Sequence, residues 1–313
     1  MLLFALNSSS ALGSGVASAL GCRLSPHEER EFACGEHKCR PLVDVWGEAV
    51  YVLSSLHGDR SYSVNDKICR LLFFIGALKD AGAQQVTAVM PYFAYSRKDR
   101  RTKANDPVTS RYVAAILESV GVDRVVTMDV HNQAAFENSF SCPSVNVTTI
   151  DLFAEYFART APEDVDTIVS PDLGGIKVSR QFLEAYAERS RSVKHFAVMD
   201  KRRSEGVVSG SGLIGEVGKH VLILDDMIGG GSTLCRAASA CREAGAQSVR
   251  VGATHGLFEH GAPAIFEHPG IDEIVVSDSV AIGNLGLGEA CLERVTILGS
   301  AELLAQCIRE MQG

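Results

Sequence analysis

Apolar residues alternate along the chain between short β-branched runs and longer segments with helical spacing. The short runs predict strands over residues 2–6, 50–53, 85–90, 124–128, 167–170, 196–199, 220–224, 249–253 and 273–276. The helical spacing predicts helices over residues 66–81, 109–120, 177–189 and 234–244, and a serine-capped helix is expected after the first strand. Strands that are apolar on both faces and separated by helices are typical of parallel sheets, so the pattern predicts an α/β fold.

An internal similarity indicates two related halves. Residues 79–86 (KDAGAQQV) and 242–249 (REAGAQSV) each end a helix at a glycine and then enter a strand. Glycine suits this position because the residue after a helix often adopts a left-handed conformation. Many α/β proteins use the same turn, so it supports the division only weakly by itself. We place the boundary near residues 145–150, which gives an N-terminal domain over 1–147 and a second domain over 148–290.

Composition excludes several classes of protein. The length of 313 residues accommodates two domains with cores of their own, and 46% hydrophobic and 22% charged residues are in the globular range. The formal net charge of −8 argues against a protein whose main task is to bind nucleic acid. The first residues lack the basic start of a signal peptide, and no segment approaches the ~20 apolar residues that cross a bilayer. We therefore expect neither a nucleic-acid nor a membrane partner.

The nine cysteines point to a reducing compartment. They are odd in number and include no CxxC pair, which indicates free thiols rather than a disulfide framework. Cys34 and Cys39 offer two metal ligands, but no second pair lies nearby, so structural thiols are the simpler interpretation. A cytoplasmic location follows as an expectation.

The strongest chemical signal is the stretch VLILDDMIGGGSTL at residues 221–234. A buried strand runs into two carboxylates, Asp225 and Asp226, and then into a glycine-rich turn and the start of a helix. Such a turn lets backbone amides approach a phosphate at the positive end of the helix, with the Ser232 and Thr233 hydroxyls beside them. The carboxylates are placed to meet sugar hydroxyls or a metal. A turn that binds nothing is the alternative, but paired carboxylates beside three glycines are costly without a partner.

This stretch resembles the phosphoribosyl-pyrophosphate-binding signature that phosphoribosyltransferases share with ribose-phosphate pyrophosphokinases. Four further stretches are similar to pyrophosphokinase motifs and follow in that family's order: MPYFAYSRKDRR at 90–101, TMDVH at 127–131, SPDLGG at 170–175 and DKRR at 200–203. The resemblance covers nearly the whole chain. It implies two tandem phosphoribosyltransferase-like domains, each a mainly parallel sheet flanked by helices, with a C-terminal segment over 291–313 that packs back on the N-terminal domain. It also implies a homo-oligomer, either a dimer or a hexamer of dimers.

The resemblance further implies an enzyme, a ribose-phosphate diphosphokinase with Mg²⁺ as cofactor. Such an enzyme transfers pyrophosphate from ATP to the C1 hydroxyl of ribose 5-phosphate, which gives phosphoribosyl pyrophosphate and AMP. On the sugar side it implies that Asp225 and Asp226 orient the ribose. The residues implied to hold the 5-phosphate are Gly229, Gly230, Gly231, Ser232 and Thr233.

On the ATP side, the resemblance assigns contacts to residues from three parts of the sequence. These are Phe32 and Glu36 around adenine; Arg97, Lys98 and Asp99 after the strand at 85–90; and His131 after the strand at 124–128. His131 and Asp172 match the family's contacts to the magnesium of ATP, an ion that keeps water and phosphate oxygens and needs few side chains. Lys201 and Arg203 match a mobile lid whose cations stabilise charge in the transition state.

Each of these motifs also has a simpler interpretation when it is taken alone. A charge run such as RKDRR at 97–101 usually lies on a solvated face, and DKRR at 200–203 would be a basic surface turn. A lone histidine such as His131 is more often a satisfied core or loop residue than a ligand. Placement after buried strands favours the functional interpretation, because α/β sheets bind ligands at the carboxyl ends of their strands.

The chain departs from the family pattern at several positions. Gly229 stands where the family usually has Asp, which removes a carboxylate from the sugar site, and Lys98 stands where Gln is usual. The loop at 32–36 lacks the Asp that usually precedes its glycine. These departures keep two alternatives open: a non-catalytic regulatory paralogue of the enzyme, and a phosphoribosyltransferase that consumes the same product.

Two further departures generate a prediction. Trp46 and Asn105 stand where many relatives carry arginines that belong to regulation by phosphate and nucleotides. We predict weak or absent dependence of the reaction on inorganic phosphate and weak inhibition by ADP. Rate assays at several phosphate and ADP concentrations measure both, and a strong requirement for phosphate contradicts the prediction.

Overall fold

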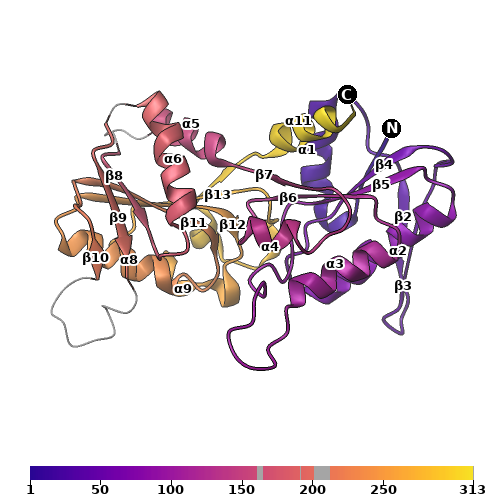
Figure 1. The fold of residues 1–313 in the computed structure, drawn as a ribbon, viewed down its shortest axis with the longest axis horizontal. Coiled ribbons are helices and arrows are strands. Elements are labelled where there is room, and N and C mark those ends of the chain that lie inside the picture. The colour runs from indigo at the N-terminus through magenta and orange to yellow at the C-terminus, as the bar shows by residue number, and fades with distance from the viewer. Residues whose placement is uncertain (161–164, 191, 201–211, 313) are drawn as a thin grey trace. The chain divides into compact units, whose positions relative to one another are not determined.

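The computed structural model describes residues 1–160, 165–190, 192–200 and 212–312, and Figure 1 draws its helices and strands. The chain divides into two compact units. The first unit contains residues 1–147, 279–284 and 299–313, and the second contains residues 148–278 and 285–298. Each unit is built around a sheet of its own.

The first unit has a five-stranded sheet in which all neighbouring strands are parallel. In spatial order the strands are β1 Leu2–Ala5, β4 Ala49–Leu53, β5 Gln85–Met90, β6 Arg124–Met128 and β7 Ser144–Val147. An antiparallel hairpin of β2 His27–Glu31 and β3 His37–Pro41 forms a separate two-stranded sheet. The hairpin and β7 are absent from the strands that the hydrophobic pattern predicts.

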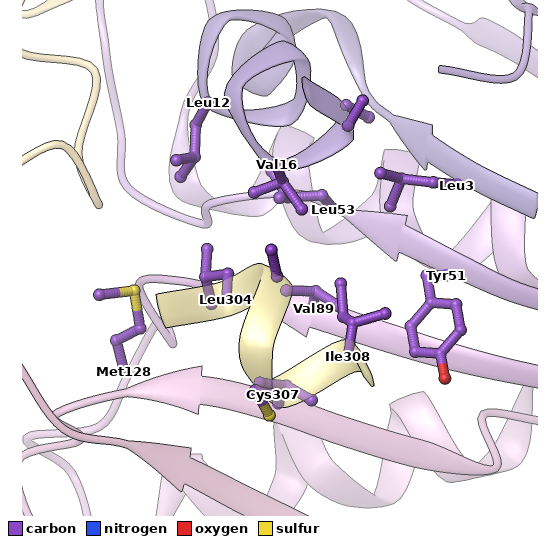
Figure 2. Packing of buried hydrophobic residues seen from close by; sticks show 14 residues of the cluster. Leu3, Leu12, Val16, Tyr51, Leu53, Val89, Met128, Leu304, Cys307 and Ile308 are labelled. Carbon is purple, nitrogen blue, oxygen red and sulfur yellow. The ribbon is translucent and has the colours of Figure 1, made fainter. Parts of the chain in front are cut away.

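Helices cover both faces of this sheet, because alternate strand residues point to opposite sides. The helices of the unit are α1 Ser10–Leu20, α2 Val64–Asp80, α3 Thr109–Ser119, α4 Gln133–Glu137 and α11 Ala301–Gln312. Figure 2 shows Val16 of α1 and Ile308 of α11 in one apolar cluster with Leu53 of the sheet. On the other face, Phe4 meets Phe74 of α2 edge to face, with ring centroids 5.2 Å apart. The last helix therefore contributes to the core of the first unit.

The serine before α1 has a different role from the one expected. Ser9 occupies the N-cap position, but its side chain makes no capping hydrogen bond. Its Oγ instead accepts the N–H of Ser55 at 2.9 Å, so the hydroxyl joins the segments that follow β1 and β4. By contrast, Ser63 and Asp66 form a complete capping box at the start of α2.

The second unit has a seven-stranded sheet that is parallel except at one edge, where β10 runs antiparallel to β9. In spatial order the strands are β10 Leu213–Ile214, β9 His195–Met199, β8 Thr167–Ser170, β11 His220–Ile228, β12 Ser248–Gly256, β13 Glu273–Ser277 and β14 Val295–Leu298. The helices are α5 Ile150–Thr160, α6 Ile176–Arg189, α8 Ser232–Glu243, α9 Pro263–Phe266 and α10 Glu289–Leu292. Phe157 of α5, Phe182 of α6 and Leu222 of β11 share the core.

The predicted α/β class is confirmed by these parallel sheets and their helices. Every predicted strand is present, and the largest difference is at β11, which continues to Ile228 because its pairing with β12 extends through Asp225, Met227 and Ile228. All nine cysteines are free thiols, in agreement with the prediction. Within the described part of the chain, every helix is too short or too polar to span a membrane.

A buried chain of polar groups follows β4 in the first unit. Lys67 Nζ lies 2.6 Å from Asp59 Oδ2, and each of the two side chains is 1% exposed. Nζ also lies 3.3 Å from Nε2 of His57, and the Nδ1 atom of this ring lies 3.1 Å from the Ser55 hydroxyl. That hydroxyl donates to the carbonyl of Ser279. Because an ammonium can only donate, we assign His57 as the neutral tautomer that accepts at Nε2 and donates from Nδ1.

The charges of Asp59 and Lys67 depend on each other. Burial favours the neutral form of Asp59, but the Lys67 ammonium and the N–H groups of Tyr62 and Ser61 outweigh it, so the pKa of Asp59 lies below its usual value. Burial is also the largest influence on Lys67 and lowers the pKa of its ammonium, while Asp59 opposes the change. Removal of either partner would leave a buried charge without compensation.

We predict that Asp59→Asn destabilises the protein by about 3–5 kcal/mol at pH 7, because the Lys67 ammonium stays buried without its anion. Asp59→Asn combined with Lys67→Met should regain most of this loss. Urea denaturation measures both. The stability that Asp59 contributes is complete above about pH 4 and is lost as the pH falls through its lower folded-state pKa. An equal acid sensitivity of wild type and Asp59→Asn contradicts this assignment.

Candidate active site

Two loops that follow neighbouring strands of the first unit lie side by side. The loop after β5 carries Arg97, Lys98 and Asp99, and the loop after β6 carries His131; Asp99 is half-buried and the other three are exposed. Asn132, next to His131, donates from Nδ2 to Asp99 Oδ2 at 2.6 Å. β5 and β6 are adjacent and parallel, so their carboxyl ends meet at one edge of the sheet. The structure thus brings the predicted residues of both loops to the same edge.

Buried aromatic rings support these two loops. Phe93 of the first loop, Phe136 of α4 and Phe140 form a cluster with ring centroids between 5.1 and 5.9 Å apart. The N–H of Met128 also donates to the carbonyl of Pro91 at 3.2 Å. The exposed charged residues of these two loops are therefore supported by a buried aromatic cluster.

Asn132 is a residue that the motif analysis did not identify. Besides its bond to Asp99, its Oδ1 accepts the N–H of Ala135 at 3.1 Å and caps α4. One side chain thus fixes the start of a helix and the neighbouring loop together. An asparagine before a helical segment is a recognisable N-cap signal, but nothing in the sequence indicates its second partner.

Phe32 and Glu36 lie at the tip of the β2–β3 hairpin. The N–H of Phe32 donates to the carbonyl of Glu36 at 2.8 Å, which closes the tip, and the Phe32 ring is exposed. The buried Arg70 of α2 holds the hairpin: its Nη2 lies 3.0 Å from Glu31 Oε2, and its guanidinium stacks over the Tyr62 ring at 4.2 Å from the centroid. The aromatic side chain expected beside adenine is therefore presented on an anchored arm.

In the second unit, Asp172 closes a turn directly after β8. Its Oδ1 accepts the N–H groups of Gly174 at 2.9 Å and Gly175 at 3.1 Å. The Ser170 hydroxyl donates to the main-chain carbonyl of Asp172 at 2.7 Å. These bonds hold the carboxylate at the carboxyl end of β8, which is the neighbour of β11 in the sheet.

Asp225 and Asp226 lie within β11, whereas the sequence pattern placed them just beyond its end. Burial, followed by the charges of Asp226 and Asp172, raises the pKa of Asp225 well above its usual value. The order of strands reverses between β8 and β11, since β9 lies on one side of the pair and β12 on the other. Carboxylates thus gather where open α/β sheets bind ligands, and such a group favours hydrogen-bond donors or a cation as its partner.

The glycine-rich turn at residues 229–233 leads from β11 into α8. Gly231 is the N-cap residue with φ of 78°, and a Cβ there would lie 2.8 Å from Ile265 Cβ, so both the backbone and the packing require glycine. Ser232 is exposed at the first position of the 12-residue helix. The unpaired N–H groups of a helix start and its dipole together favour an anion at this turn.

The predicted lid residues Lys201 and Arg203 and the predicted metal contacts His131 and Asp172 stay predictions. Lys201 and Arg203 lie outside the described residues, so their role in a lid stays a prediction. No three histidine, cysteine or acidic side chains gather as a metal site within residues that the structure describes. Burial and the charge of Glu29 raise the pKa of Cys39 to about 12, so this thiol is a poor metal ligand at neutral pH.

Comparison with known proteins agrees with this architecture. Residues 1–121 match a family model described as the N-terminal domain of ribose phosphate pyrophosphokinase, and residues 189–312 match the phosphoribosyl synthetase-associated domain. Ribose-phosphate pyrophosphokinase 1 of Streptococcus pyogenes serotype M3 is 35% identical over 315 residues, which covers 98% of this chain and 92% of the relative. The serotype M1 protein gives the same values. The crystal structure of phosphoribosylpyrophosphate synthetase from Mycobacterium smegmatis matches with a TM-score of 0.85 at 30% identity, covering 99% of this chain and 98% of the other.

The parallel α/β units, one of them with a glycine-rich turn after paired carboxylates, define the chain as a phosphoribosyltransferase-like protein. The extent of the similarity narrows this class, because relatives more than 30% identical align over almost the entire chain. The chain belongs to the ribose-phosphate pyrophosphokinase family. This confirms the predicted family and the predicted fold class.

We predict that Gly231→Ala destabilises the protein by about 1–3 kcal/mol through its left-handed backbone alone, and that contact with Ile265 adds to this loss. Gly230→Ala is the matched control from the same turn, because a Cβ at Gly230 meets nothing within 4 Å. It should change stability by less than about 1 kcal/mol. Urea denaturation compares the two variants, and equal midpoints contradict the prediction.

Proposed function

We propose that this chain transfers pyrophosphate from Mg-ATP to the C1 hydroxyl of ribose 5-phosphate, which gives phosphoribosyl pyrophosphate and AMP. The observation that carries the proposal is the phosphate turn at 229–233 directly after the carboxylates of Asp225 and Asp226. A ligand that fits both features has a phosphate and several hydroxyls on one small scaffold. A sugar phosphate has this chemistry.

On the sugar side, the 5-phosphate binds the main-chain N–H groups at the start of α8, with hydrogen bonds from Ser232 and Thr233. Asp225 and Asp226 accept hydrogen bonds from ribose hydroxyls and so orient the C1 oxygen. The high pKa of Asp225 supports this role, because a carboxylate crowded by Asp226 and Asp172 gains most from donors that arrive with the ligand.

On the nucleotide side, Phe32 and Glu36 frame adenine, and Arg97, Lys98 and Asp99 border the phosphates of ATP. The exposed ring of Phe32 offers a face for stacking. The exposed cations of the loop after β5 match the charge of a polyphosphate.

Mg²⁺ is the proposed cofactor, with His131 and Asp172 as its protein contacts. A carboxylate is a ligand that Mg²⁺ prefers, and a cation near Asp172 would relieve the repulsion that Asp225 experiences. Magnesium bound to ATP takes most of its ligands from phosphate and water, so two side chains are sufficient. When bound, the ion neutralises polyphosphate charge and polarises the phosphorus under attack.

The reaction forms a bond from the C1 oxygen to the β-phosphorus and breaks the bond from that phosphorus to the oxygen shared with the α-phosphorus. The C1 hydroxyl loses its proton, and AMP leaves with the electron pair of the broken bond. Such a transfer needs positioning and charge stabilisation more than covalent help. In the proposal Lys201, Arg203 and Arg97 supply the stabilising positive charge.

The homo-oligomeric state and the cytoplasmic location are part of the proposal as well. The first rests on the family, whose members build dimers and larger rings. The second is supported by the nine free thiols.

One observation keeps a second function in view. Gly229 carries no carboxylate at the first position of the phosphate turn, which favours a regulatory paralogue that binds the substrates without turnover. A phosphoribosyltransferase, the other alternative, needs only the turn and would consume phosphoribosyl pyrophosphate.

We predict that the purified protein forms AMP and phosphoribosyl pyrophosphate in equal amounts from Mg-ATP and ribose 5-phosphate. Lys201→Ala should reduce kcat by about 10²–10³-fold, because it removes one charge that stabilises the transition state. Lys219→Ala is the matched control, since Lys219 is an exposed lysine of the second unit outside the proposed site. Folded wild type without AMP formation contradicts the enzyme and favours the paralogue. Pyrophosphate release from phosphoribosyl pyrophosphate with a nucleobase favours the transferase.

A further inference from the structure

The segment that follows β12 is bonded along its main chain to the start of the phosphate turn. The N–H groups of Leu257 and Phe258 donate to the carbonyl of Ile228 at 2.9 and 3.0 Å. The N–H of Glu259 then donates to the carbonyl of Gly229 at 3.2 Å. Three successive residues therefore hold this segment at the first residue of the turn.

The carboxyl group of Glu259 occupies the space that a side chain at position 229 would fill. A Cβ on Gly229 would lie 3.2 Å from Cδ and Oε2 of Glu259 and 3.3 Å from its Oε1. Unlike Gly231, Gly229 has no left-handed φ, so its backbone does not require glycine. The missing side chain instead leaves room for a carboxylate from another loop.

The backbone around Glu259 has an unusual conformation that fixes this position. Phe258, His260 and Ala262 have φ values of 42°, 53° and 36°, in the left-handed region that residues with a Cβ rarely adopt. Phe258 and Ala262 are buried, and the Phe258 ring packs against Phe266 with centroids 5.0 Å apart. Strained backbone of this kind persists where packing enforces it, and it is concentrated at ligand-binding sites.

We infer that Glu259 supplies a sugar-binding carboxylate in place of residue 229, and that it accepts a hydrogen bond from a ribose hydroxyl of ribose 5-phosphate. The inference rests on the proposed function, because it takes the same ligand at the same turn. An ionised carboxylate can only accept, and its bonds from hydroxyl groups are short and strong. A phosphate group offers no such donor and is repelled by the Glu259 carboxylate, so it binds instead at the N–H groups at the start of α8.

The geometry also crowds carboxylates at positions 229 and 259 against each other, because a Cβ at 229 would already lie 3.2 Å from the Glu259 carboxyl group. In the wild type, an aspartate at 229 would meet the Glu259 carboxyl group at once. Once Glu259 is shortened to alanine, the same aspartate has the space and stands at the same end of the turn. A carboxylate lost from one position should therefore be replaceable from the other.

Calorimetric titration with ribose 5-phosphate and, separately, inorganic phosphate tests the inference on the full chain. Glu259→Gln should lower the affinity for ribose 5-phosphate about tenfold, as expected for the loss of one hydrogen bond to a charged group. Glu259→Ala should lower this affinity at least as much. Affinity for phosphate should stay the same or rise. Glu267→Gln, an exposed glutamate just after α9, is the matched control and should leave both affinities unchanged.

The swap gives the sharper result. Added to the wild type, Gly229→Asp should lower the affinity for ribose 5-phosphate. Added to Glu259→Ala, the same substitution should restore most of the lost affinity. Thermal melts confirm that each variant is folded. An unchanged affinity of Glu259→Ala for ribose 5-phosphate overturns the inference. An equal rise of its affinities for ribose 5-phosphate and for phosphate also overturns it, because Glu259 would then act only as a charge that repels both ligands.

Calorimetry measures binding independently of turnover, so the proposed enzymatic function and the inference about Glu259 can fail separately. If wild type binds ribose 5-phosphate through Glu259 but forms no AMP, the inference stands and the enzymatic function fails. If wild type forms AMP and the Glu259 variants bind the sugar phosphate as tightly as wild type, the function stands and the inference fails. A wild type that does not bind ribose 5-phosphate overturns both.

Discussion

Main-chain pairing between parallel strands is the interaction on which the candidate residues of both units depend. The strand interiors are buried on both faces and so are closed to ligands, which leaves the carboxyl ends of the strands as the place for chemistry. Pairing of β5 with β6 brings the loop of Asp99 beside that of Asn132. Pairing of Ile223 with Val169 in β11 and β8 sets Asp225 level with the start of the Asp172 turn. A shift of register by one residue would turn these side chains to the other face of the sheet.

Glycine has two different physical uses in the phosphate turn. At Gly231 the left-handed backbone and the contact with Ile265 both exclude a side chain. At Gly229 the backbone is ordinary, and the small residue yields its space to Glu259. The motif GGG therefore combines one position whose glycine is required by conformation with one whose glycine permits an approach from another loop. Sequence alone does not separate these uses, because the letter is the same.

The hydrophobic pattern predicted the strands of both central sheets where apolar runs are continuous, and it missed elements that other forces stabilise. The β2–β3 hairpin consists largely of charged residues, and the buried Arg70, whose guanidinium stacks on Tyr62, holds it through Glu31. β7 and β14 are four-residue edge strands, and each carries at least one polar residue on one of its two faces. β11 was predicted too short because Asp225 and Asp226 look like a strand end. Pairing with β12 nevertheless continues through Asp225, Met227 and Ile228, and the N–H of Asp226 donates to Asp225 Oδ1 at 3.0 Å.

For the candidate site, the sequence likewise predicts individual residues but not the residues to which they bond. The motifs predicted Asp99, His131, Asp172 and the glycine-rich turn at 229–233 as site residues, since each follows a buried strand. Their partners lie elsewhere in the chain: Asn132 bonds to Asp99 across 33 residues of sequence. Such partnerships arise from the register of neighbouring strands and the path of the loops, which no local pattern encodes.

The second unit also limits the chemistry of its ligand on electrostatic grounds. The start of α8 favours an anion, while Asp172, Asp225 and Asp226 repel one and favour donors or a cation. A simple anion would satisfy only the helix start, and a cation only the carboxylates. A molecule with a phosphate at one end and hydroxyls at the other satisfies both without a net excess of either charge, and the opposite polarity of the two regions fixes which end binds where. In the proposed function, the order of β11, turn and helix would orient the sugar phosphate, because the carboxylates precede the turn and the amides follow it.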